Sequence, residues 1–357
     1  MASSGAFTMT GGDVAYSYTK NSTIQRDIVD AGKELIKEAL SEKFDLKSLG
    51  FDTPSTVVKI ADLGCSVGPN TFFVMQNIIE AIELKFHQAK NQNYSALEFQ
   101  AFFNDHYEND FNILFKTLPP SRKFFAAGVP GSFHGRLFPK SSLHFAHISN
   151  ALHFLSKVPK EVVDRNSPVW NKGNVLNSSV KEVAEAYSTQ FKVDMECFLN
   201  ARAEELVPGG LMFILGGVVP DGISASETMG GVYNDVMGSC LKDLVKIGVL
   251  EEEKVNSFNV PVYGATPKEL EAIFSTNGKF SIEKMEKFTQ PMKTPLSPEG
   301  YVLAVRAGSD GLMRNHFGDE SAEQIFKHFT TKVEENFDKI LGVVRNNLNL
   351  FILLKRI

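Results

Sequence analysis

Cysteine is scarce in this chain, and long hydrophobic runs are absent. Its cysteines, Cys65, Cys197 and Cys240, are only 3 among 357 residues. An odd number of widely spaced cysteines without a CxxC pair excludes a disulfide framework and a zinc knuckle, and it indicates a reducing compartment. The first residues, MASSGAFTMTGGD, lack the basic start and apolar run of a secretory signal. No stretch approaches the roughly 20 apolar residues of a membrane span. We therefore expect a cytoplasmic protein with no membrane role.

Runs of basic residues, internal repeats and low-complexity tracts are absent as well. The chain carries 37 Lys and Arg against 42 Asp and Glu, which gives a formal net charge of −5. Proteins that bind nucleic acid usually gather their basic residues into a patch or stripe. The scattered charges therefore predict no nucleic-acid partner, and they allow a small uncharged or acidic ligand, since a local site can oppose the global charge.

The residues that are present specify a globular α/β protein. Hydrophobic residues make up 43% of the chain and charged residues 22%, far from the composition of disorder. Short apolar runs alternate with stretches of helical period, which predicts a parallel, doubly wound sheet. Most of the 29 phenylalanines are expected to pack in its core. The predicted strands are 57–60, 97–103, 123–129, LHFAHI ending near Ser149, LMFILGG, FSIEKMEKF and LNLFILLKRI; the clearest helices are 31–44, 72–86 and 180–206.

The most informative stretch is the glycine loop DLGCSVGPN, from Asp62 to Asn70. Its glycines allow a sharp turn after a strand, and the helix that follows presents free N–H groups. A dinucleotide site would need G-x-G-x-x-G, but the spacing here is G-x-x-x-G with Ser66 between, so that interpretation is weak. A methyl donor brings an amino-acid end, a ribose and an adenine, and it suits Asp62 with Asp105 at the end of the next strand. The alternative for Asp105 is a helix cap or turn former.

Six sequence features resemble the plant SABATH methyltransferases. They are SYTKNS (17–22), Gln25, DLGCSVGPN (62–70), FFNDHYENDFN (102–112), GVPGSFHGRLFP (128–139) and LHFLSKVP (152–159). The resemblance runs from Gly11 to the C-terminus. It implies a class I methyltransferase fold with a helical cap, usually as a homodimer. It also implies S-adenosylmethionine as methyl donor and the methyl ester of a phytohormone, terpenoid or aromatic acid as product.

The resemblance also implies a division of the chain and a donor site. Residues 1–30 would cover donor and acceptor, and 31–217 would form the methyltransferase core. Residues 218–278 and 291–346 would form the helical cap, while 279–290 and 347–357 would supply closing strands of the core sheet. The residues that match donor-contacting positions of the family are Tyr18, Asp62, Cys65, Asn70, Asp105, Ser132 and Phe133.

The acceptor positions depart from the usual family pattern. By the resemblance, Gln25, Asn150, His153 and Phe154 belong to the acceptor site. Most members have Tyr where Asn150 stands and Trp where Phe154 stands. Both replacements remove bulk, and they predict a larger pocket and a longer or non-planar acid. His153 could supply the donor that the indole N–H provides in many relatives.

The family is also associated with a Mg²⁺ site remote from the chemistry. Its pattern corresponds here to Asn171, Asn256, Phe258 and Asn259. Amide and backbone oxygens suit a hard cation, but Asn256 replaces the acid of the family and removes its charge. A second metal hypothesis, joining His144 to His147, is disfavoured because residues i and i+3 of a strand lie on opposite faces.

Methyl transfer from a sulfonium to a carboxylate is a direct displacement and requires no general base, because the acid is already ionised. The sequence therefore predicts catalysis by orientation, with Gln25 as the anchor of the carboxylate. Three alternatives remain open: a nicotinamide-dependent oxidoreductase, a non-catalytic acid-binding homologue, and an N-methyltransferase of the same family.

Overall fold

A seven-stranded sheet forms the centre of the protein. The computed structural model describes residues 8–45, 49, 57–89, 97–172, 180–289 and 292–357. The strand order is β3-β2-β1-β4-β5-β7-β6; strands β1 to β5 run parallel, and β7 is antiparallel to both of its neighbours. The strands are β1 (Val57–Leu63), β2 (Glu98–Asp105), β3 (Phe125–Pro130), β4 (Leu143–Ser149), β5 (Leu206–Gly217), β6 (Phe280–Phe288) and β7 (Asn349–Arg356).

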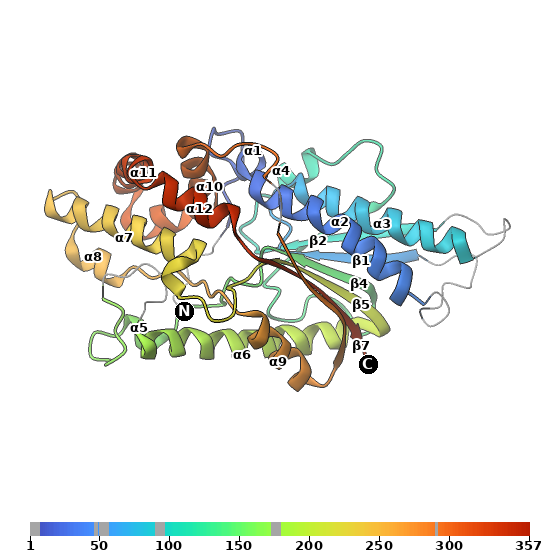
Figure 1. Cartoon of the computed structure of the whole chain (residues 1–357). Helices are drawn as coiled ribbons and strands as arrows, with labels where there is room; N and C mark the ends of the chain where they lie inside the picture. Colours follow the sequence, from blue (N-terminus) through green and yellow to red (C-terminus); the bar gives the residue numbers. More distant parts are fainter. Residues whose placement is uncertain (1–7, 46–48, 50–56, 90–96, 173–179, 290–291) are drawn as a thin grey trace.

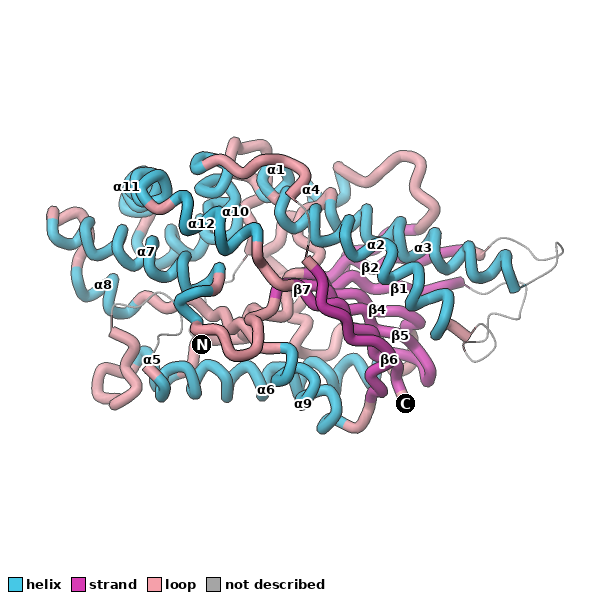
Figure 2. The backbone as a smooth tube through the Cα atoms, in the orientation of Figure 1, coloured by secondary structure: helices cyan, strands magenta, loops and turns pink. Residues whose placement is uncertain are grey.

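Helices cover both faces of this sheet, as Figures 1 and 2 show. Helices α2 (Thr23–Lys43) and α3 (Asn70–Ala89) lie on one face, and α6 (Lys181–Glu205) and α9 (Pro267–Asn277) lie on the other. Helix α2 approaches β5 closely at Gly32, where an added Cβ would meet a Leu215 methyl at 2.8 Å. Shorter helices are α1 (Tyr18–Asn21), α4 (Phe111–Lys116) and α5 (Lys160–Val163).

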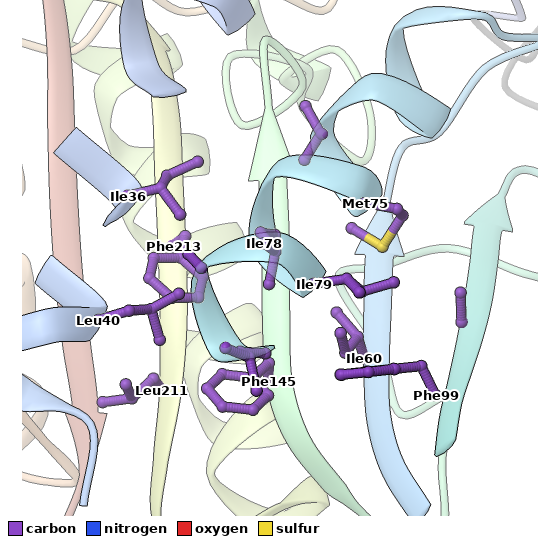
Figure 3. Close-up of a cluster of buried hydrophobic side chains, with 14 of the residues drawn as sticks. Ile36, Leu40, Ile60, Met75, Ile78, Ile79, Phe99, Phe145, Leu211 and Phe213 are labelled. Carbon is purple, nitrogen blue, oxygen red and sulfur yellow. The ribbon is translucent and has the colours of Figure 1, made fainter. Parts of the chain in front are cut away.

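Each face of the sheet buries its own hydrophobic cluster. Ile36 and Leu40 of α2 pack with Ile78 of α3 against Phe145 and Phe213 of the sheet (Figure 3). On the opposite face, α6 and α9 pack against the alternate residues of the same strands. Central strands buried on both faces explain why the sequence shows near-continuous apolar runs there.

A separate group of helices lies beside the sheet, at the left of Figure 1. These helices pack around a third cluster of buried side chains, which includes Met237, Leu241 and Phe329. Two of them have side-chain caps: Thr228 accepts a hydrogen bond from Gly231 N, and Ser297 accepts one from Gly300 N. The group comprises α7 (Met229–Lys246), α8 (Glu252–Ser257), α10 (Pro298–Phe317), α11 (Asp319–Glu335) and α12 (Phe337–Arg345), preceded by the short 3-10 helix η1 (Ala225–Glu227).

The predicted doubly wound α/β sheet is confirmed, and two element boundaries were wrong. Helix α2 begins at Thr23, eight residues before the predicted start at Ala31, since its apolar stripe continues through Ile28 and Val29. Helix α6 ends at Glu205, one residue from the predicted end, but strand β5 begins at Leu206, five residues before the predicted LMFILGG. The run from Pro208 to Gly210 therefore lies inside the strand, where the pairing with β4 shifts register.

The division into an N-terminal segment, a core and a cap stays a prediction. Within it, residues 1–7 and 290–291 lie outside the described residues. Helix α9, which the sequence assigned to the cap region, packs beneath the sheet against α6 and β6. Among the described residues, no helix is both long and apolar enough to cross a membrane.

Candidate active site

The loop between β1 and α3 contains three residues whose backbone has a left-handed conformation. Gly64, Ser66 and Gly68 have φ values of 75°, 54° and 78°. A side chain at Gly64 would bring its Cβ within 2.7 Å of the Ala151 Cβ, so only glycine fits there. The N–H groups of Gly64 and Cys65 both donate to the Asn104 carbonyl of β2, at 2.9 Å each. The end of β2 therefore holds the predicted donor loop in place.

Asp105 lies at the end of β2 and supports the same loop. Its Oδ2 accepts a hydrogen bond from Ser66 N at 2.7 Å, and its Oδ1 accepts one from His106 N at 2.7 Å. Burial raises the pKa of Asp105 to about 6, because no ion pair with a basic side chain offsets the desolvation within the described residues. A half-buried carboxylate of this kind can still accept hydrogen bonds from a ligand.

Asp62, at the end of β1, is enclosed by two side chains. Its Oδ1 is 2.7 Å from Nδ1 of His147 on β4, and its Oδ2 accepts a hydrogen bond from the Thr71 hydroxyl of α3. All three side chains are buried. His147 was not among the predicted site residues; the signal that could have found it is the parallel register, which pairs Asp62 directly with His147.

A first cavity, here named the polar cavity, lies between the carboxyl end of the sheet and helix α2. Asn70 fixes one wall by donating to Ser22 O at 3.1 Å and to Ser22 Oγ at 3.0 Å, while Tyr18 shares a hydrogen bond with Asn70. Among the residues that line this cavity are six predicted from the sequence: Tyr18, Gln25, Asp62, Cys65, Asn70 and Asn150.

A second cavity, here named the apolar cavity, is lined in part by residues of β5, β7, α6 and α9. Its lining includes His153, Phe191, Tyr263 and Leu270. Asn150, with φ of 51°, lines this cavity as well as the polar one. The short side chain of Asn150 therefore lies at the boundary that the polar and apolar cavities share.

His153 and Phe154 belong to a turn that is tied to a distant segment. Tyr263 N donates to His153 O at 2.9 Å, and Phe154 forms an isolated bridge with Val262. The two rings lie 4.2 Å apart between centroids. Burial lowers the pKa of His153 to about 4, so its imidazole is neutral near pH 7. Phe154 is not among the residues that line either cavity; it contacts the ring of His153, which lines the apolar one.

Ser132 and Phe133 lie in a loop next to Gly64, and neither lines the two cavities. A fully buried ion pair holds this loop. Arg202 Nε donates to Glu205 Oε2 at 2.7 Å, while Arg202 Nη1 and Nη2 donate to the carbonyls of Phe133 and Gly135 at 2.6 and 2.8 Å. The N–H groups of Leu137 and Phe138 donate to Glu205 Oε1 at 2.5 and 3.0 Å.

The predicted magnesium ligands gather in one place but do not fit the ion. Asn259 Oδ1 accepts hydrogen bonds from Asn171 Nδ2 at 2.8 Å and from the Tyr187 hydroxyl at 3.3 Å. The amide oxygen that a cation would need is thus already engaged, and Asn256 and Phe258 add no carboxylate. Among the described residues, no cluster of three or more His, Cys, Asp or Glu could hold a metal. The magnesium site stays a prediction that this arrangement does not favour.

The ion pair in the loop leads to a stability test. Glu205→Gln keeps the size of the side chain but leaves the buried Arg202 charge uncompensated. Removing one partner of a buried pair costs about 3 to 5 kcal/mol, and we expect the free energy of unfolding to fall by that amount. Glu204→Gln is the matched control, because this exposed neighbour pairs with Arg136 at the surface and should change stability by less than about 1 kcal/mol. Denaturant unfolding of both variants checks this, and equal effects would contradict the role of the pair.

Comparison with known proteins identifies the family. The family model described as SAM dependent carboxyl methyltransferase matches residues 4–357. Loganic acid O-methyltransferase of Catharanthus roseus is 44% identical, covering 98% of this chain and 94% of that protein. Farnesoic acid carboxyl-O-methyltransferase of Arabidopsis thaliana is 43% identical, covering 98% and 99%.

A solved structure agrees with these relatives. The structure of loganic acid methyltransferase with SAH superposes with a TM-score of 0.92 at 44% identity, and it covers 98% of both chains. The sheet order, the glycine loop and the match over nearly the whole length lead to one conclusion. The chain belongs to the SABATH family of S-adenosylmethionine-dependent carboxyl O-methyltransferases.

Proposed function

We propose that this enzyme methylates the carboxylate of an acid with a tail bulkier than that of benzoate or salicylate, such as a terpenoid-like acid. The observation that carries this proposal is the position of Asn150 between the polar and apolar cavities. With Asn in place of the Tyr of most relatives, an acid can keep its carboxylate in the polar cavity while its tail enters the apolar one. The relatives named for loganic acid and farnesoic acid support a non-planar substrate.

In this proposal the methyl donor occupies the polar cavity and the adjoining loops. Asp105 accepts hydrogen bonds from the ribose hydroxyls, and Tyr18, Asp62, Cys65 and Asn70 surround the amino-acid end. Ser132 and Phe133 contact the adenine from the loop that Arg202 and Glu205 hold; both belong here on the family pattern alone, since neither lines the cavities.

The acceptor side uses Gln25, His153 and Asn150. An amide N–H of Gln25 donates to one carboxylate oxygen and directs the other toward the methyl group. His153, neutral because of its lowered pKa, can donate a single N–H without the strong attraction of an ion pair. Orientation at about 3 to 3.5 Å can supply roughly 7 to 11 kcal/mol of the barrier reduction, so the reaction needs no base. The homodimer and the cytoplasmic location stay predictions.

Asp105 gives donor binding a characteristic pH dependence. A ribose hydroxyl donates more strongly to the ionised carboxylate than to the neutral acid, and the pKa of Asp105 in the free protein is about 6. Affinity for S-adenosylhomocysteine should therefore be constant above neutral pH and fall as pH drops through that value.

Titration calorimetry between about pH 5 and pH 8 measures this effect. Near pH 8, Asp105→Asn should bind S-adenosylhomocysteine one to two orders of magnitude more weakly than wild type, which corresponds to the loss of one charge-assisted hydrogen bond. Its affinity should also no longer change with pH. Glu108→Gln, which changes an exposed acid of the same turn, should retain the fall in affinity at low pH. A wild-type affinity that does not change with pH would refute the ribose role.

We expect Gln25 to be needed for a normal rate of methylation of every acid, whatever its size. Gln25→Ala removes the anchor, and a misplacement of the reacting oxygen by about 1 Å can reduce the rate roughly 100-fold. Initial rates of ester formation on one compact and one bulky acid give kcat/KM. Gln76→Ala, at an exposed glutamine of α3, serves as control. Normal rates for both acids would show that Gln25 is not the anchor.

Asn150→Tyr tests the size of the substrate. The larger side chain should separate the two cavities, lowering kcat/KM on a terpenoid acid by roughly 10-fold to 200-fold while leaving a compact acid little affected. Asn166→Tyr is the matched control, because this exposed asparagine lines neither cavity. A panel of aromatic, terpenoid and hormone acids with labelled donor provides the readout. If wild type prefers the compact acids, or if its product is an N-methyl heterocycle, the proposal fails.

A further inference from the structure

His147 is the buried titratable group that the proposed mechanism leaves unused. Its side chain is 1% exposed and lines the polar cavity, beside Asp62. Because the carboxylate of Asp62 can only accept, the 2.7 Å contact assigns the proton to Nδ1 of His147. In the neutral tautomer that carries this proton, Nε2 has a lone pair. This atom is buried and has no hydrogen-bond partner within the described part of the chain.

A second acceptor in the same cavity is also unsatisfied. Gln25 Oε1 is buried without a partner among the described residues. Asp62 adds a negative charge, and the side chains that contact it are those of His147 and Thr71. Buried polar atoms are nearly always hydrogen-bonded. Two acceptors without partners around one cavity therefore indicate that a bound ligand supplies a hydrogen-bond donor there. The negative charge of Asp62 indicates that this donor is a cation.

The α-ammonium of the methyl donor has this chemistry, with three N–H bonds and a positive charge. We propose that His147 is a positioning residue that accepts a hydrogen bond from this ammonium at Nε2. Asp62 fixes the tautomer and the ring, and Thr71 fixes Asp62 in turn. The proposal rests on the donor placement described above, in which the amino-acid end occupies the polar cavity.

Gln25 would then contact both substrates. Its Oε1 accepts from the ammonium, and its amide N–H donates to the carboxylate of the acid. His147, in contrast, touches only the donor in this arrangement. A change at His147 should therefore raise KM for the donor and leave KM for the acid unchanged, whereas a change at Gln25 affects both.

His147→Asn separates the two ring nitrogens, because the amide nitrogen of Asn can replace Nδ1 toward Asp62 while nothing replaces Nε2. Calorimetry compares S-adenosylhomocysteine with 5′-methylthioadenosine, which lacks the amino-acid end. We expect affinity for the first to fall about 10-fold or more, as for one hydrogen bond to a charged group, and affinity for the second to stay at the wild-type value. His144→Asn is the matched control: this half-buried histidine of the same strand accepts from Lys59 N, at 3.0 Å, and lines neither cavity.

Equal losses for both ligands, or no loss for either, would overturn the proposal. Should His147→Asn fail to fold, as judged by its melting transition, His147→Gln decides instead, because its amide oxygen reaches the position of Nε2. It should bind S-adenosylhomocysteine at least one-third as tightly as wild type, and a 10-fold selective loss would contradict the proposal. The acid panel is a separate measurement: absence of any ester product would refute the proposed function and leave the ligand comparison intact.

Discussion

The pairing of β1 with both of its neighbours is the constraint on which the site depends. Strand β1 runs parallel to β2 on one side and to β4 on the other, so three carboxyl ends meet at one edge. Ligands of open α/β sheets bind at such an edge, where the strand order reverses. A shift of one residue in register would turn Asp62 away from His147 and toward the opposite face. The donor loop, Asp105 and Asn150 all take their positions from this one arrangement.

Charge distribution at this edge is unusual for a protein interior. Asp62 is buried and Asp105 is half-buried. Burial raises the pKa of the nearby Tyr18 and Cys65, and the negative charges of Asp105 and Asp62 raise it further. The one fully buried Arg beside the site, Arg202, is neutralised by Glu205 and by backbone carbonyls, so it does not offset these acids. A site with surplus negative charge suits a ligand that carries both a sulfonium and an ammonium, and it needs the acid substrate to be anchored by neutral donors.

The enclosure of the site comes from segments that are far apart in sequence. Thr10 N donates to Ala307 O of α10 at 2.8 Å, and the Arg306 guanidinium lies 3.8 Å from the Tyr16 ring. On the other side, the turn with His153 is tied to Tyr263. The N-terminal segment is therefore tied to α10, and the turn after β4 is tied to the segment before α9. In the proposed function, changes in the turn after β4 or in the segment before α9 would alter the acid that fits without disturbing the loop from Asp62 to Asn70.

The sequence by itself determined the sheet, the glycine loop and the family. Apolar runs of strand length, the G-x-x-x-G spacing after Asp62 and the ordered motifs are local features, and local features can be recognised from the sequence without the fold. The wrong boundaries, at the start of α2 and at the start of β5, arose where packing on the sheet and a register shift overrode the local signals. Only the tertiary structure decided that His147 contacts Asp62, that Asn150 lines two cavities and that Asn259 is hydrogen-bonded to Asn171. These contacts join residues up to 88 positions apart, and they exist because strand register and helix packing bring distant side chains within reach.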